Sequence, residues 1–138
     1  MQEYNVIVVL NCDKSRLLLC KRKKDPYKGL SNLVGGKVEL GEYGEAAAYR
    51  ELFEETGISP DDIKLTHLMD FTYYIYDCYV EVYVGKLKHP LTVTGSENEL
   101  YWSELTRNFF DVSLFAGEGN IGHIMEQVRI NEDKLLQD

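Results

Sequence analysis

The sequence predicts an α/β fold in which a β-sheet lies between helices. Extended segments rich in β-branched residues alternate along the chain with two helical patterns, one in the middle and one at the C-terminal end. Such an alternation favours layers in which helices cover a sheet. The 138 residues have the length of one domain, and no repeat, low-complexity tract or linker divides them. We therefore expect residues 1–138 to form a single domain.

The N-terminal part of the chain contains three expected strands. Residues 5–10, NVIVVL, are β-branched and apolar, which is typical of a buried strand. A polar turn separates them from RLLLCKR at residues 16–22, so these two segments are expected to form a hairpin. After a loop rich in turn-forming residues, residues 32–34 are expected to be extended.

The second half of the chain contains three further expected strands and a helix. Residues 64–76 and 78–87 are long extended segments, and the second alternates valine with tyrosine and glutamate, as a half-buried strand does. A shorter expected strand carries Trp102. Residues 106–119 look irregular, and apolar residues at helical spacing then predict a C-terminal helix over residues 121–136.

Composition restricts the partners and the compartment. The formal net charge of -8 argues against binding to nucleic acid polymers or anionic membranes. No segment has the apolar length of a membrane helix, and the N-terminus lacks the basic start and cleavage site of a secretory signal. The three cysteines are widely spaced, as expected for free thiols in a reducing cytoplasm. We therefore expect a cytoplasmic protein, and the sequence leaves its oligomeric state open.

The most informative stretch is GKVELGEYGEAAAYRELFEETGI at residues 36–58. On an α-helix, Glu51 and Glu55 lie one turn apart, and Glu54 lies beside them at three-residue spacing. Three like charges on one stripe destabilise a bare helix, but clustered carboxylates are the ligands that Mg²⁺ or Mn²⁺ prefers. An acidic, solvated helix face is the alternative interpretation.

The remaining helix residues are expected to hold this acidic stripe in place. Arg50 lies one turn before Glu54 and is expected to hold its carboxylate with the planar guanidinium. Gly57 suits a left-handed helix cap, and Gly35 and Gly36 allow the backbone to approach a metal or a phosphate closely. The apolar helix face expected to be buried consists of Ala46, Tyr49, Leu52 and Phe53.

The complete pattern resembles the signature box of the Nudix hydrolases. A chance match of nine constrained positions has a probability on the order of one in ten million. The resemblance implies a Nudix fold, a mixed β-sheet sandwiched between α-helices, and hydrolysis of a nucleoside diphosphate linked to another group. Every fixed position of the box is filled, by Gly36, Glu42, Arg50, Glu51, Leu52, Glu54, Glu55, Gly57 and Ile58.

The resemblance assigns roles to the box residues one by one. Glu51, Glu54 and Glu55 are the expected metal ligands, together with the carbonyl of Gly36. The expected metal is Mg²⁺, with Mn²⁺ as an alternative. Glu51 and Glu54 are also expected to be catalytic, and Arg50 is expected to orient the glutamates.

The resemblance also points to acids beside the helix. Glu42 is expected to support the junction between the loop and the helix. Many members use one more acid from a loop ahead of a Trp-containing strand, and here Glu97 and Glu99 precede Trp102. Glu99 is the preferred catalytic candidate, with a plain surface acid as the alternative.

Substrate choice depends on residues outside the box. The resemblance extends to MutT-type enzymes that remove oxidised purine nucleoside triphosphates. In their eukaryotic branch an Asn before the Gly-Gly turn reads the base, and Asn32 matches it. An aromatic residue and an acidic pair precede the last helix there; Phe115 and Glu118 fall at that place, although Gly117 replaces one acid. Lys37 is the fourth expected substrate-binding residue, and a core position is the alternative for Phe115.

These observations predict Mg²⁺-dependent hydrolysis of a nucleoside triphosphate to the monophosphate and pyrophosphate, with an oxidised purine such as 8-oxo-dGTP as a candidate substrate. The first alternative is a hydrolase of dinucleoside polyphosphates or of another nucleoside-diphosphate-X. Tyr74 and Tyr76 lie where diadenosine polyphosphate hydrolases often carry a tyrosine. The second alternative is a non-catalytic nucleotide-sensing Nudix domain, although such domains usually lose box glutamates that are all present here.

Overall fold

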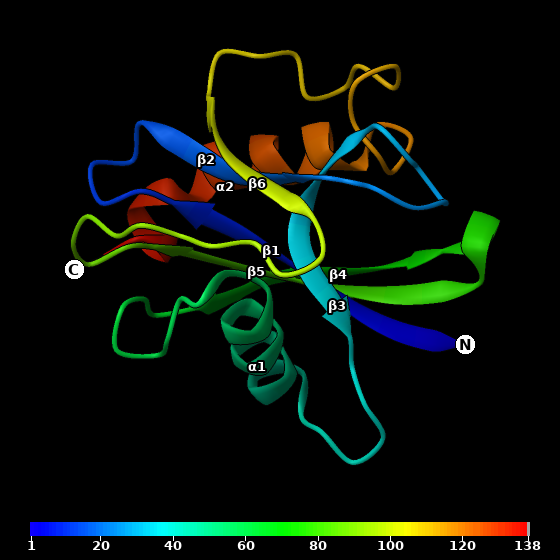
Figure 1. The fold of residues 1–138 in the computed structure, drawn as a ribbon, viewed down its shortest axis with the longest axis horizontal. Coiled ribbons are helices and arrows are strands. Elements are labelled where there is room, and N and C mark those ends of the chain that lie inside the picture. Colours follow the sequence, from blue (N-terminus) through cyan, green and yellow to red (C-terminus); the bar gives the residue numbers. More distant parts are fainter. Residues whose placement is uncertain (138) are drawn as a thin grey trace.

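The computed structural model describes residues 1–137, in which a six-stranded sheet is combined with two α-helices (Figure 1). The predicted order of extended and helical segments is confirmed. The elements are β1 (Gln2–Leu10), β2 (Arg16–Lys21), β3 (Ser31–Lys37), α1 (Gly44–Thr56), β4 (Thr66–Tyr73), the short 3-10 helix η1 (Tyr74–Tyr76), β5 (Cys78–Lys86), β6 (Glu99–Glu104) and α2 (Asn120–Leu135).

The sheet is mixed, as the Nudix resemblance implies. Its strand order is β4-β5-β1-β3-β2-β6, in which β1 and β5 are parallel and the other neighbours are antiparallel. The expected hairpin is only partly formed, because β1 and β2 pair only at Leu10 and Leu17. Strand β3 separates them: it pairs with β2 through residues 31–33 and with β1 through residues 34–37.

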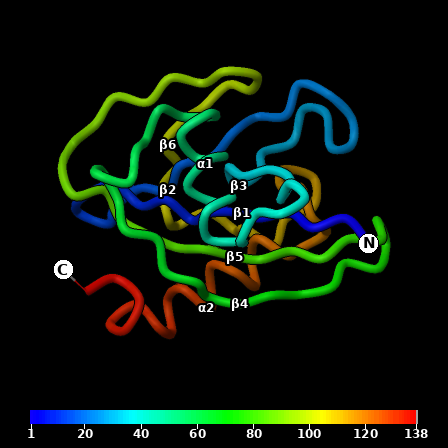
Figure 2. The backbone as a smooth tube through the Cα atoms, turned by 90° about the horizontal axis from the view of Figure 1, so that it is seen from below, coloured from blue at the N-terminus to red at the C-terminus, as the bar shows by residue number. Residues whose placement is uncertain are grey.

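The two helices cover opposite faces of the sheet, as Figures 1 and 2 show. Strand β1 is buried on both faces, which explains its continuous apolar sequence. Ile7 and Val9 belong to the core cluster beneath α1, whereas Val8 and Leu10 belong to the cluster beneath α2. No helix within residues 1–137 has the length and apolarity to cross a membrane.

Helix α1 buries only part of the predicted face: Leu52 is buried and Tyr49 packs against the core cluster beneath α1. Ala46 is exposed, and Phe53 has 55% of its surface exposed. The helix packs against the glycines of β3, and Glu51 lies directly over Gly36, which has no side chain to exclude it. The acidic stripe therefore borders the buried face instead of standing opposite to it. The buried helix residues are Ala47, Ala48, Leu52 and Thr56.

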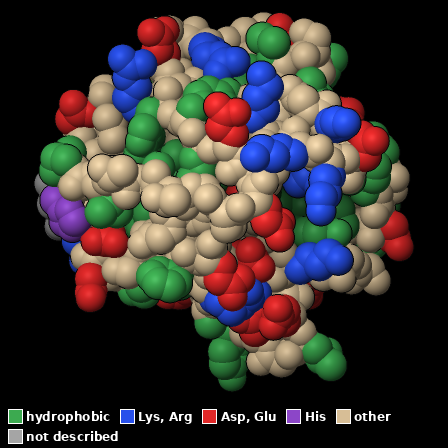
Figure 3. Space-filling model, viewed as in Figure 1, with side chains coloured by type: hydrophobic (Ala, Val, Ile, Leu, Met, Phe, Trp, Pro, Cys, Tyr) green, Lys and Arg blue, Asp and Glu red, His purple; other side chains and the backbone are tan. Residues whose placement is uncertain are grey.

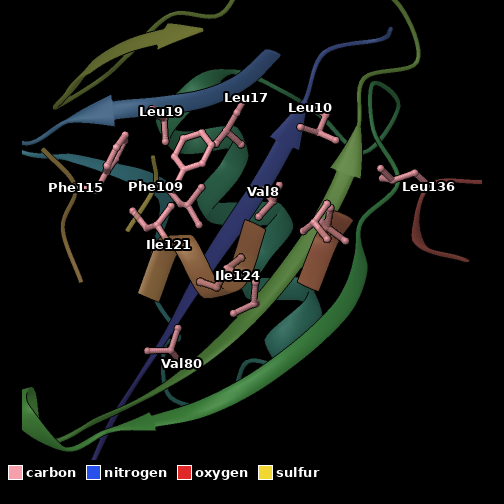
Figure 4. Packing of buried hydrophobic residues seen from close by; sticks show 14 of the residues in the cluster. Val8, Leu10, Leu17, Leu19, Val80, Phe109, Phe115, Ile121, Ile124 and Leu136 are labelled. Atoms are coloured by element: carbon pink, nitrogen blue, oxygen red, sulfur yellow. The ribbon is translucent and has the colours of Figure 1, made fainter. Parts of the chain in front are cut away.

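Glycines shape the ends of both helices. Gly57 ends α1 as predicted, with φ of 80° and its N–H bonded to the carbonyl of Phe53. Before α2, Gly117, Glu118 and Gly119 have φ of 90°, 51° and 94°, so three successive residues are left-handed. This turn directs α2 onto the sheet, where its apolar side packs into the core (Figure 4).

Candidate active site

A cavity of about 830 Å³ joins the box glutamates to a group of aromatic side chains. Glu51 and Glu55 reach it from α1, whereas Phe71 and Tyr73 reach it from the face of the sheet that packs against α2. The cavity therefore has an acidic part and an aromatic part. A second cavity, of about 330 Å³, lies beside α2 and contains no box residue.

Arg50 connects the acids of the box. Its Nη1 donates to Glu51 Oε1 and Glu54 Oε2, both at 3.0 Å. Its Nε and Nη2 donate to Glu42 at 2.7 and 2.8 Å, and Nη2 also donates to the carbonyl of Lys37 at 3.1 Å. These bonds from the guanidinium lower the pKa of Glu42 to about 2. Figure 3 shows carboxylates gathered on this side of the molecule, over α1.

Glu51 is packed against the backbone of Gly36. A Cβ at Gly36 would lie closer than 3.0 Å to the Glu51 carboxylate, so a side chain at this position would displace that carboxylate. Burial raises the pKa of Glu51, although the hydrogen bond from Arg50 opposes the shift. The Gly36 N–H donates to Asn5 Oδ1 at 3.3 Å, which fixes the turn from the strand side.

Glu55 lies deeper than the other box acids. The N–H of Gly35 donates to its Oε2 at 3.0 Å. Burial raises the pKa of Glu55, and that bond opposes the shift. Burial and the nearby Glu55 charge together raise the pKa of Cys20 to about 12, so Cys20 remains a thiol.

The box residues suit a hard divalent cation by donor type. Three carboxylates and a glycine residue line one cavity, and oxygen donors of this kind are preferred by Mg²⁺ and Mn²⁺. Arg50 holds two of these carboxylates, and the three do not form a tight cluster. Within residues 1–137, the group with ligand atoms within 4.8 Å of one another consists of His67, Asp70 and Glu81, none of which lines the cavity.

The acid expected outside the box is placed differently from the prediction. Glu99 is exposed on β6, where it pairs with Lys21, and does not line the cavity. Glu97 does line it, together with Asn98. Glu99 begins β6, whereas Glu97 lies in the loop that precedes the strand. Of these two acids, Glu97 is the one that lines the cavity.

Phe115 occupies the core and not the cavity. It is 1% exposed, its ring centroid lies 5.2 Å from that of Phe109, and Figure 4 shows both among the core side chains. The guanidinium of Arg107 lies 4.6 Å from the Phe115 centroid. The expected stacking of Phe115 on a base is therefore contradicted, because both neighbours already cover its ring.

The other expected substrate-binding residues divide into two groups. Asn32 and Lys37 line the cavity. The Asn32 Oδ1 accepts the Leu33 N–H at 2.8 Å. Glu118 does not line the cavity, and its Oε2 accepts a hydrogen bond from the hydroxyl of Tyr27 at 2.8 Å. Glu118 thus contacts a cavity residue instead of facing the cavity itself.

Several residues that line the cavity were not predicted from the sequence. Phe71 and Tyr73 are two residues apart on β4, and that alternation was the available signal for a shared face. Tyr27 lies in a loop, where no periodicity marks it. Of the two tyrosines named for dinucleotide binding, Tyr76 lines the cavity, whereas Tyr74 is 83% exposed.

Two curated relatives match part of the chain. The ADP-ribose pyrophosphatase of Methanocaldococcus jannaschii is 52% identical over 46 residues, which cover 33% of this chain and 27% of the relative. The putative 8-oxo-dGTP diphosphatase of Bacillus subtilis is 49% identical over 51 residues, covering 37% and 32%. The chain thus spans about a third of the length of these relatives.

Solved structures share the fold over nearly the whole chain. A Caenorhabditis elegans Ap4A hydrolase binary complex has a TM-score of 0.78 at 20% identity, covering 96% of this chain and 98% of that one. The NUDIX domain of Shewanella oneidensis NrtR complexed with ADP ribose has a TM-score of 0.74 at 19% identity, covering 94% and 87%. Residues 1–114 match the NUDIX domain family model. With its filled signature box at residues 36–58 and its mixed sheet between two helices, the chain belongs to the NUDIX domain family.

Proposed function

We propose that this chain is a Mg²⁺-dependent pyrophosphohydrolase that converts a nucleoside triphosphate to the monophosphate and pyrophosphate. The observation that carries the proposal is one cavity that combines the three expected metal-binding glutamates of the box, Glu51, Glu54 and Glu55, with a group of aromatic side chains. A purine such as that of 8-oxo-dGTP is the candidate base. Asn32 in the cavity lining and the partial match to an 8-oxo-dGTP diphosphatase support this choice.

Different residues of the chain would have different roles in such a reaction. Glu51, Glu54, Glu55 and the Gly36 carbonyl would hold Mg²⁺, which supplies neutralisation of phosphate charge and a lower pKa of a bound water. Arg50 orients Glu51 and Glu54 through its shared Nη1. Glu54 has a side chain that is 59% exposed, so its carboxylate is accessible to accept a proton.

The substrate's phosphates also require positive charge from the protein. Arg22 and Lys37 line the same cavity as the box acids. Figure 3 shows further Lys and Arg side chains beside the acidic region. This arrangement suits a polyphosphate chain that lies between basic side chains and the cation-binding acids.

A hydrolase of dinucleoside polyphosphates is the second candidate. It is favoured by the position of Tyr76, which lines the cavity at the place where such enzymes carry a tyrosine. A nucleotide-sensing domain is less favoured, because all box glutamates are present and Arg50 contacts three of them, Glu42, Glu51 and Glu54.

We further propose that residues 1–138 form one domain and that the protein is cytoplasmic. Two core clusters on the two faces of one sheet support the single domain. Three free cysteines, two of them buried, support a reducing compartment.

The proposal is tested with a Mg²⁺-supplemented panel of 8-oxo-dGTP, unmodified dNTPs, dinucleoside polyphosphates, ADP-ribose and nucleotide sugars. We expect pyrophosphate and a monophosphate from a nucleoside triphosphate, and a Glu54→Gln preparation controls for contaminating hydrolases. A clear preference for a dinucleoside polyphosphate would replace the first candidate by the second. Turnover of none of these compounds would support the sensing domain.

A further inference from the structure

Four aromatic side chains from three segments form a continuous series along the cavity. Phe71 and Tyr73 come from β4, Tyr76 from η1, and Tyr27 from the loop between β2 and β3. Successive ring centroids lie 6.4, 5.6 and 5.6 Å apart, with interplanar angles of 64°, 74° and 71°. These are edge-to-face contacts. We call these four residues the aromatic compartment.

The hydroxyl of Tyr73 has no hydrogen-bond partner. Among the buried side-chain nitrogen and oxygen atoms of residues 1–137, Asn5 Nδ2 and Tyr73 Oη lack one, and both residues line this cavity. Buried polar groups in native proteins are nearly always paired, so an unpaired one in a ligand cavity indicates a partner that the ligand supplies. Other tyrosines are paired: the hydroxyl of Tyr83, for example, donates to Glu81 at 2.7 Å.

Tyr27 is held in place from two sides. Its hydroxyl donates to Glu118, and its ring makes a T-shaped contact with the ring of Tyr76. Tyr27 and Glu118 both have a left-handed backbone, with φ of 68° and 51°, although neither is glycine. Such conformations persist where the surrounding structure imposes them, and they concentrate at binding sites. Burial, followed by the bond to Glu118, raises the pKa of Tyr27, which therefore keeps the proton that it donates.

The position of the compartment relative to the box suggests which part of a nucleotide it takes. The box acids extend from α1, whereas Phe71 and Tyr73 pack with the core cluster on the α2 side of the sheet. A nucleotide carries its phosphates and its base at opposite ends. Phosphates beside the box acids therefore leave the base for the aromatic compartment. Tyr76 is 48% exposed, so this side of the aromatic compartment is open to solvent.

We propose that the aromatic compartment binds the purine base of the substrate, that the Tyr73 hydroxyl hydrogen-bonds the polar edge of that base, and that Glu118 is a positioning residue for Tyr27. This inference rests on the proposed function for the identity of the ligand as a nucleotide. It gives Glu118 a different role from base reading, because the carboxylate already accepts the Tyr27 hydroxyl. A purine presents N7, and guanine also O6, as an acceptor for a tyrosine hydroxyl.

Equilibrium binding of GMP and ribose 5-phosphate in EDTA tests the base site without any hydrolysis of the ligand. The wild type should bind GMP at least about tenfold more tightly than ribose 5-phosphate, because stacking contributes to the first ligand alone. Tyr73→Phe should weaken GMP binding roughly tenfold and leave ribose 5-phosphate binding unchanged. Tyr74→Phe is the matched control, since Tyr74 is the exposed neighbour outside the cavity, and it should change neither.

A melting measurement on the free protein separates this role from a structural one. Tyr73→Phe keeps the ring and removes an unpaired hydroxyl, so Tm should stay the same or rise. A lower Tm with unchanged GMP affinity would overturn the assignment of Tyr73. If hydrolysis fails for every nucleotide but GMP binding still depends on Tyr73, the base site stands and the proposed chemistry does not. If the protein hydrolyses a nucleoside triphosphate but GMP binding does not depend on Tyr73, the base site is refuted and the proposed chemistry stands.

Rescue by a conservative change tests the positioning role of Glu118. Glu118→Gln keeps an oxygen that accepts the Tyr27 hydroxyl, so GMP affinity should stay near wild type. Glu118→Ala removes the acceptor and should weaken GMP binding several-fold, as should Tyr27→Phe. Combining Glu118→Ala with Tyr27→Phe should add nothing further, because both remove one interaction. Loss of affinity in Glu118→Gln, or additive effects in the double variant, would refute positioning through Tyr27.

Discussion

Arg50 holds the carboxylate of Glu42 with two hydrogen bonds, from Nε to Oε2 at 2.7 Å and from Nη2 to Oε1 at 2.8 Å. Glu42 lies in the loop before α1 and Arg50 lies within the helix, so the pair fastens one to the other. The Nη1 of the same guanidinium reaches Glu51 and Glu54. The position of this loop and the orientation of two expected metal ligands thus depend on the Arg50 side chain.

Arg50→Lys should separate charge from geometry. Lysine keeps the positive charge but lacks the planar fork, so it cannot hold Glu42 on two sides while also reaching Glu51 and Glu54. We expect kcat/KM for the best substrate to fall by at least about tenfold, because the glutamates lose their orientation. Arg129→Lys is the matched control, since Arg129 pairs with Glu126 on the exposed side of α2. Equal activity in Arg50→Lys and Arg129→Lys would contradict the orienting role.

The bond between Arg50 and Glu42 also predicts a dependence of stability on pH. Hydrogen bonds from Arg50 lower the pKa of Glu42 from its ordinary value of 4.5 to about 2. A carboxyl group with a lowered pKa in the folded state stabilises the fold above its unfolded pKa and loses that contribution as pH falls. The loss should occur between pH 4.5 and about 2. Urea unfolding should show wild type more stable than Glu42→Gln near neutral pH, with the difference shrinking in that window. A constant difference throughout it would exclude this account.

The two adjacent glycines of the box turn should respond differently to alanine. A Cβ at Gly35 would meet the backbone carbonyl of Asn5, and its φ of +153° is rare for residues with side chains. Gly35→Ala should therefore destabilise the fold, by roughly 1–3 kcal/mol. A Cβ at Gly36 would meet the end of the Glu51 side chain, which is able to move. We expect Gly36→Ala to fold normally and to lose activity. Melting measurements test the first expectation, and turnover measurements test the second. A lower Tm for Gly36→Ala than for Gly35→Ala would contradict this account.

Local sequence patterns were sufficient for the elements but not for their pairing. The alternation of Val80, Val82 and Val84 marked β5, because alternate side chains of a strand share a face. The insertion of β3 between β1 and β2 depends on contacts between whole strands, and no local pattern encodes such a pairing. The apolar run at residues 5–10 therefore predicted a buried strand correctly, because a strand is a local feature. The expected hairpin was only partly right, because it depends on which strands pair.

The site was predictable where it lies within one motif. Residues 36–58 carry their own spacing, and the contact of Arg50 with Glu54 follows from the pitch of a helix. The hydrogen bond between Tyr27 and Glu118 joins residues 91 positions apart, and no local sequence pattern around either residue predicts it. Phe115 was misplaced because an aromatic residue in a loop looks the same whether it faces a ligand or Arg107.

Glu54→Gln and Glu55→Gln should each reduce kcat by about 10²-fold or more, because each removes a charged oxygen ligand or a proton acceptor. Both variants should fold: Glu54 has an exposed side chain, and the amide oxygen of glutamine at position 55 still accepts the Gly35 N–H. Glu45→Gln, an exposed acid in the first turn of α1, is the matched control and should retain activity. EDTA should abolish turnover, and added Mg²⁺ should restore it. Full activity in both variants, or undiminished turnover in EDTA, would exclude a metal site on these glutamates.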